Sequence, residues 1–125
     1  MADREEVKKY LDDVLATFQP DNVAGVSMVM QYEITGEGGG TWHMQIADCK
    51  CDLIEGEHPS PDMRTIMKAD DWIDMNTGAL GGMKAWITGK MKYKGDMRIA
   101  RRMDKEKWFA YELPMSVGSA FKKTK

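Results

Sequence analysis

Two segments in the first half of the chain alternate apolar and polar residues, and this pattern restricts the fold more than any other feature. Over residues 25–35 every second side chain is apolar, and the alternation resumes over residues 42–46. A period of two is typical of a β-strand with one buried face. The glycine-rich run 36–40 between them (GEGGG) suits a hairpin loop. We therefore expect a hairpin whose apolar face must be covered by other elements.

The rest of the chain is expected to supply helices and further strands. Asp3 and Glu6 form the Asp-x-x-Glu pattern that is typical of a helix N-cap, and Pro20 ends the helical spacing that follows. Further strands are expected around 51–53, 63–67 and 90–94, and further helices at 69–76, 80–87 and 96–103. This order predicts an α+β fold in which helices lie on a mostly antiparallel sheet.

Length and composition indicate one globular domain over residues 1–125. The sequence lacks a run of about 18 apolar residues, so we expect no membrane span. The charged start of the chain, with Asp3, Arg4, Glu5 and Glu6, argues against a secretory signal peptide. We therefore expect a cytoplasmic protein with reduced cysteines.

Charge is divided unevenly along the chain. Residues 1–82 carry 16 acidic and 6 basic side chains, whereas residues 83–125 carry 4 acidic and 12 basic ones. Two interpretations stay open. The halves can fold together with their charges facing each other, or the second half can present a basic surface to anionic lipid headgroups or to an acidic partner. We expect no nucleic-acid partner.

The candidate catalytic groups are few. Cys49 and Cys51 form a lone Cys-x-Cys, whereas structural zinc sites normally use two spaced ligand pairs. His43 has the opposite parity to Trp42 and is expected to point to solvent. No Ser or Cys lies in a nucleophile-elbow sequence, and the chain has two histidines. The sequence therefore predicts no enzyme, no metal site and no cofactor. A metal or thiol enzyme that uses the two cysteines is a minor alternative.

Methionine is unusually frequent, with 12 in 125 residues. Met is unbranched and polarizable, so it adapts to cavities of changing shape. Many of the Met residues fall on the inward positions of the expected strands and on the short helices. Together with Trp72, Trp86 and Tyr93 they can line an apolar cavity between sheet and helices. A solid core rich in Met is the alternative.

Two motifs resemble the sterol carrier protein-2 domain family. Residues 32–42 (YEITGEGGGTW) are similar to its first hairpin, and residues 89–97 (GKMKYKGDM) are similar to its signature. The resemblance covers about residues 5–105 and leaves a tail, 106–125, unmatched. It implies a five-stranded mixed, mostly antiparallel sheet covered on one face by helices, enclosing a hydrophobic tunnel. The tunnel wall implied by position comprises Trp72, Ile73, Leu80, Met83, Trp86, Met91, Tyr93, Met97, Ala100 and Met103.

The expected function is a non-catalytic intracellular lipid carrier. The resemblance implies a fatty acid, fatty acyl-CoA, phospholipid or sterol-like ligand held in the tunnel. Because several basic residues follow Gly89, we also expect transient contact with an anionic membrane surface. The alternative is a protein-interaction or homodimerisation module whose Met-rich groove accepts an apolar helix. Monomer and dimer both stay open.

Overall fold

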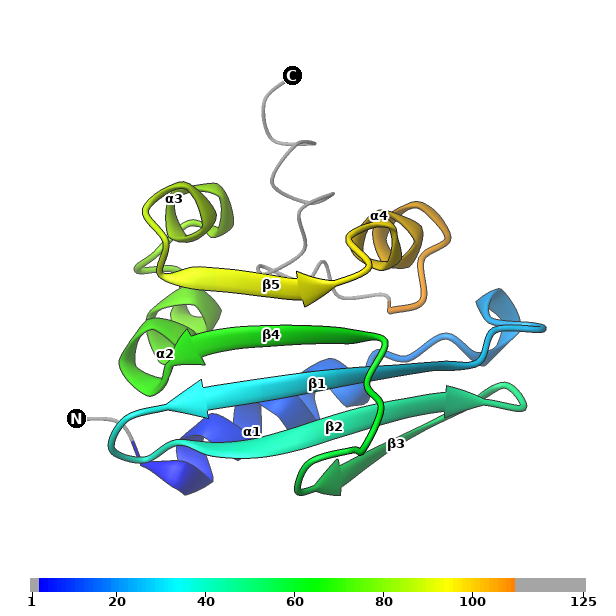
Figure 1. The fold of residues 1–125 in the computed structure, drawn as a ribbon, viewed down its shortest axis with the longest axis horizontal. Coiled ribbons are helices and arrows are strands. Elements are labelled where there is room, and N and C mark those ends of the chain that lie inside the picture. The colour runs from blue at the N-terminus through cyan, green and yellow to red at the C-terminus, as the bar shows by residue number, and fades with distance from the viewer. Residues whose placement is uncertain (1–2, 110–125) are drawn as a thin grey trace.

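The helices and strands predicted from the sequence are present, with ends that differ by a few residues. The computed structural model describes residues 3–109, and within them the side chains of all but residues 82, 83, 86, 100 and 104. Along the chain the elements are α1 (Arg4–Leu15), the 3-10 turn η1 (Pro20–Asn22), β1 (Met28–Thr35), β2 (Gly40–Ala47), β3 (Lys50–Glu55), β4 (Met63–Lys68), α2 (Ala69–Thr77), α3 (Gly82–Ile87), β5 (Met91–Gly95) and α4 (Arg98–Lys105). Figure 1 shows their arrangement.

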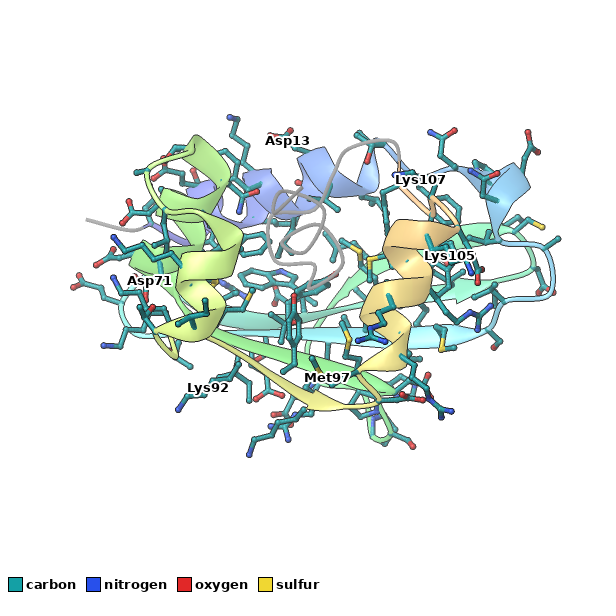
Figure 2. All side chains as sticks on the ribbon, turned by 90° about the horizontal axis from the view of Figure 1, so that it is seen from above. Asp13, Asp71, Lys92, Met97, Lys105 and Lys107 are labelled. Atoms are coloured by element: carbon teal, nitrogen blue, oxygen red, sulfur yellow. The ribbon has the colours of Figure 1, made fainter. Side chains whose placement is uncertain are left out.

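The five strands form one mixed sheet in the order β3-β2-β1-β4-β5. The central strands β1 and β4 are parallel, and the other three neighbouring pairs are antiparallel. The helices lie on one side of this sheet (Figure 2). The predicted fold class, a mostly antiparallel five-stranded sheet covered on one face by helices, is confirmed. The strand order was not predicted, because alternation along a strand does not say which strand lies beside it.

The core lies between the sheet and the helices, as the alternation predicts. The inward positions of β1 and β2, including Met30, Tyr32, Trp42 and Met44, are almost fully buried. Helix α1 begins where the Asp3 side chain accepts a hydrogen bond from the Glu5 backbone N–H, at 2.8 Å. It covers the sheet with the apolar stripe Val7, Leu11 and Val14.

The opposite face of the sheet is partly covered by residues 56–62, which cross β2 and β1 in Figure 1 on the way to β4. His43 Nδ1 donates to the Gly56 carbonyl oxygen at 2.8 Å, and Gln31 Oε1 accepts from the His58 backbone N–H at 2.8 Å. His43 is 5% exposed. The prediction that it points to solvent was wrong, because parity assigns the face of the sheet but not what crosses that face.

The core continues beyond residue 105. Trp108 and Phe109 are buried, and Phe109 forms an isolated β-bridge and a ring contact with Phe18. The Gln19 backbone N–H donates to the Trp108 carbonyl oxygen at 2.8 Å. The first residues of the expected tail therefore pack against the segment that follows α1. The rest of that tail, 110–125, lies outside the described residues.

Candidate functional site

The helix-covered face of the sheet is the surface on which the sequence placed its candidate site. Four of the ten predicted wall residues are buried there: Trp72, Leu80, Met91 and Met103. Ile73 and Tyr93 are partly buried and pack against the same core. Met97 is 37% exposed near the start of α4, so its side chain does not belong to the buried set (Figure 2). The side chains of Met83, Trp86 and Ala100 lie outside the described ones.

Trp72 joins α2 to both α1 and the sheet. Helix α2 follows β4 directly and ends at Gly78, whose φ of 89° is left-handed. The Trp72 indole N–H donates to the Val7 carbonyl oxygen at 3.2 Å. Its ring centroid lies 6.2 Å from that of Tyr32. Trp72 is therefore a fixed part of the interior, positioned by three elements.

Flexible side chains fill much of this interior. At least seven of the 12 Met residues are buried. They come from all layers of the fold and are Met30, Met44, Met63, Met67, Met75, Met91 and Met103. Because Met has three rotatable side-chain bonds and no branch, such an interior can change shape at lower cost than one built from Val and Ile.

Four interior residues form one row across the sheet, and each carries a buried polar atom that has no hydrogen-bond partner among the described residues. Tyr32 on β1 pairs with Trp42 on β2 and with Thr65 on β4, and Thr65 pairs with Tyr93 on β5. The unpaired atoms are the hydroxyls of Tyr32, Thr65 and Tyr93 and the indole nitrogen of Trp42. We call these four residues the polar row.

The polar row is energetically unusual. A buried donor or acceptor left without a partner costs about 1–3 kcal/mol, and native proteins contain few of them. Burial raises the pKa of the Tyr32 phenol well above its usual value. Burial also raises the pKa of the Tyr93 phenol, and the neighbouring Tyr32 raises it further. Both phenols therefore stay protonated and can donate hydrogen bonds at any physiological pH.

Sequence reasoning placed Tyr93 in the site but treated Tyr32, Trp42 and Thr65 as ordinary inward positions. Thr65 was the one available signal, because it is a polar residue between Met63 and Met67 on an inward parity. The row itself could not be found this way, since it depends on the register between strands far apart in sequence.

The outer face of the sheet has different chemistry. Arg64 forms a bidentate pair with the Glu33 carboxylate, whose second partner is the Gln31 amide at 2.9 Å. The His43 and His58 rings are packed edge to face, with their centroids 5.3 Å apart. Among residues 3–109, no group of three or more His, Cys, Asp or Glu side chains could hold a metal ion.

The two cysteines differ in environment. Cys49 is exposed in the turn between β2 and β3, and Cys51 is partly buried on β3. Burial raises the pKa of the Cys51 thiol to about 12, with a smaller contribution from the neighbouring Asp52 carboxylate. Cys51 is therefore a poor thiolate at neutral pH, which suits a packing role rather than nucleophilic chemistry.

A cleft of about 560 Å³ opens at the ends of β1 and β4, between the start of α2 and the segment 88–92 that leads into β5. Its charged lining residues are of both signs: Lys68, Lys90, Lys92, Asp70 and Asp71. Lys92 points away from the helices (Figure 2), so the cleft differs from the predicted tunnel on the covered face.

No helix within residues 3–109 is long and apolar enough to cross a membrane.

Known proteins share this sequence pattern and this fold. The profile of the SCP-2 sterol transfer family matches residues 11–105. Hydroxysteroid dehydrogenase-like protein 2 from Bos taurus is 34% identical over 103 residues, which are 81% of this chain and 24% of that protein. The chain thus spans about a quarter of the length of the curated relatives it matches.

Solved structures show the same architecture. Sterol carrier protein 2 like 2 from Aedes aegypti superposes with a TM-score of 0.65 at 22% identity, covering 80% of this chain and 94% of the other. Sterol carrier protein-2 from Aedes aegypti, solved in complex with the C16 fatty acid palmitate, gives a TM-score of 0.54 at 22% identity and covers 77% and 92%. Since the family profile covers about three quarters of the residues and the fold agrees, the chain belongs to the SCP-2 sterol transfer family.

Proposed function

We propose that this domain is a non-catalytic carrier that binds one lipid between the helices and the covered face of the sheet. The observation that carries the proposal is the Met-rich apolar interior on that face, in a fold whose relative from Aedes aegypti was solved with palmitate. A fatty acid, fatty acyl-CoA, phospholipid or sterol-like molecule would fit this chemistry.

Binding would draw on desolvation of the hydrocarbon chain. Burying a sixteen-carbon chain yields about 0.8 kcal/mol per methylene, roughly 12 kcal/mol in total. Association costs of several kcal/mol reduce this to an affinity near micromolar. The described core side chains of this interior are almost fully buried, so entry of the lipid would require the Met side chains to move apart and form the tunnel.

Catalysis is not part of the proposal. The described buried polar residues are Gln31, His43 and Thr65. Gln31 and His43 belong to the outer face, where they bond the 56–62 segment. The hydroxyls and the indole of the polar row can orient a ligand, but hydroxyls with no base beside them are not activated nucleophiles.

A binding experiment with a matched pair of variants tests the carrier function. Delipidated protein is titrated with a fluorescent C16 fatty acid, and native mass spectrometry of the freshly purified protein identifies any bound lipid. Met103→Phe adds volume to the interior face of α4, whereas Arg101→Phe changes an exposed position on the same helix. We expect saturable binding that Met103→Phe weakens several-fold and Arg101→Phe leaves unchanged. The absence of both co-purified lipid and saturable binding would refute the function.

We also propose transient contact with anionic membranes through the outer face of β5. Lys92 and Lys94 are exposed there, and each Lys near an anionic surface contributes about 1 kcal/mol. Vesicles containing phosphatidylserine should bind the protein at low salt and release it at high salt. Changing both residues to Glu should abolish this binding. Changing the exposed Lys50 on β3 to Glu should not.

A further inference from the structure

We infer that the polar row receives the uncharged polar head of the bound lipid, a hydroxyl or carbonyl oxygen, and so favours lipids with neutral heads. This inference rests on the proposed lipid-binding function and specifies which end of the lipid lies at the sheet. It is carried by four buried polar atoms that have no partner in the described part of the chain.

The geometry makes the row one continuous surface. Its residues occupy consecutive strands β2, β1, β4 and β5 in direct register, so neighbouring side chains are about 5 Å apart and the row is about 15 Å long. Thr65 lies between the two phenols. A ligand oxygen placed over Thr65 would therefore lie between Tyr32 and Tyr93.

The donors in the row favour an oxygen acceptor. An indole N–H only donates, whereas phenol and threonine hydroxyls both donate and accept. A carbonyl oxygen or an alcohol of the ligand can accept from these groups, and an alcohol can also donate to Thr65. A wholly apolar ligand would leave all four atoms without partners, which is costly in a buried site.

The surroundings favour an uncharged head over a carboxylate. The described buried residues include no Lys or Arg, and the guanidinium over the Trp42 ring, that of Arg4, is exposed and already paired with Glu55. Burial disfavours negative charge in this part of the interior, and for the same reason it raises the pKa of both phenols in the row. An ionised carboxylate there would pay its desolvation without an ion pair. A hydroxyl, an ester carbonyl or a protonated acid would not.

Deleting single hydroxyls tests the inference. The variants are Tyr32→Phe, Thr65→Val and Tyr93→Phe, which keep side-chain shape. Tyr10→Phe is the matched control, because Tyr10 is a partly buried tyrosine on α1 outside the row. The probes are hexadecan-1-ol, hexadecane and palmitate, each measured at pH 8 by displacement of the fluorescent fatty acid from delipidated protein.

We expect each row variant to weaken hexadecan-1-ol binding about five- to tenfold, the loss of about one hydrogen bond, while hexadecane binding changes less than about twofold. The thermal midpoint of the lipid-free row variants should equal or exceed that of the wild type, since deleting an unpaired buried hydroxyl breaks no hydrogen bond and removes its desolvation cost. Tyr10→Phe should alter neither affinity.

Three results would overturn the inference. One is an equal loss for alcohol and alkane, which indicates a packing effect. Another is destabilisation of the lipid-free row variants, which means that the hydroxyls bond to protein or to bound water. The third is that the wild type binds palmitate more tightly than the alcohol and that the row variants weaken palmitate binding as much as alcohol binding. This result would mean that the row holds an ionised head. Failure of every probe to bind the wild type would instead refute the carrier function itself, and the inference with it.

Discussion

Replacing Gly95 by Ala should destabilise this domain much more than replacing Gly89 by Ala. Both glycines have positive φ, 101° at Gly95 and 76° at Gly89, so each substitution forces an L side chain into an unfavourable backbone conformation. A Cβ at Gly89 would meet no atom within 4 Å. A Cβ at Gly95 would lie 2.5 Å from the Asp62 carbonyl oxygen and 3.2 Å from the Met63 Cα.

The difference in destabilisation between the two variants follows from the hydrogen bonds of Asp62. The backbone conformation alone costs about 1 kcal/mol at either glycine. At Gly95 the backbone of Asp62 must also move. Asp62 exchanges two hydrogen bonds with Val29, of 2.8 and 2.9 Å, and accepts one from the Asp96 backbone N–H at 3.3 Å. Weakening two or three of these at about 1 kcal/mol each brings the total to about 3–4 kcal/mol.

Urea and thermal unfolding, followed by tryptophan fluorescence and circular dichroism, provide the measurement. For a domain of this size about 1 kcal/mol corresponds to roughly 3–6 °C. Gly89→Ala should therefore lower the midpoint by a few degrees and Gly95→Ala by about 10–20 °C. Equal shifts for the two variants would refute the reasoning, because they would mean that the close approach of β5 to Asp62 carries no energetic weight. The Gly-Asp of the GKMKYKGD motif would then need another explanation.

Three further predictions concern individual side chains. Trp72→Phe should lower the free energy of unfolding by about 1–3 kcal/mol, since it removes the bond to Val7 and part of the ring; a loss below about 0.5 kcal/mol in urea titrations would contradict the role of Trp72 in joining α1 to α2. Iodoacetamide at pH 8, followed by peptide mass spectrometry, should label Cys49 and leave Cys51 largely unmodified, since burial raises the Cys51 pKa to about 12; equal labelling would contradict its burial. The hydrogen bond from Arg64 lowers the pKa of Glu33 below its ordinary 4.5, so this pair stabilises the fold above that pH and its contribution is lost as pH falls through the lowered folded value. In Glu33→Gln the free energy of unfolding should therefore fall less steeply as the pH is lowered. An unchanged pH dependence of the free energy of unfolding would show that the pair does not stabilise the fold.

Much of the fold followed from patterns along the chain. The alternation over 25–35 and 42–46 predicted β1 and β2 and the face of each that is buried, because burial on one side of a strand requires a period of two. The capping pattern at Asp3 and the helical spacing after it predicted α1. The prediction for His43 was wrong because the alternation does not show that a distant loop covers its face of the sheet.

The candidate site was likewise predictable only in part from the sequence. Sequence alone determined that one face of the sheet is apolar and rich in Met, and it placed Trp72, Met91 and Tyr93 among the residues that face the interior. Only the tertiary structure decided that Tyr93, Thr65 and Tyr32 lie in one row whose polar atoms have no partner within the described part of the chain. The physical reason is that period and propensity are local, whereas strand order and register are set by how the whole chain buries its apolar surface.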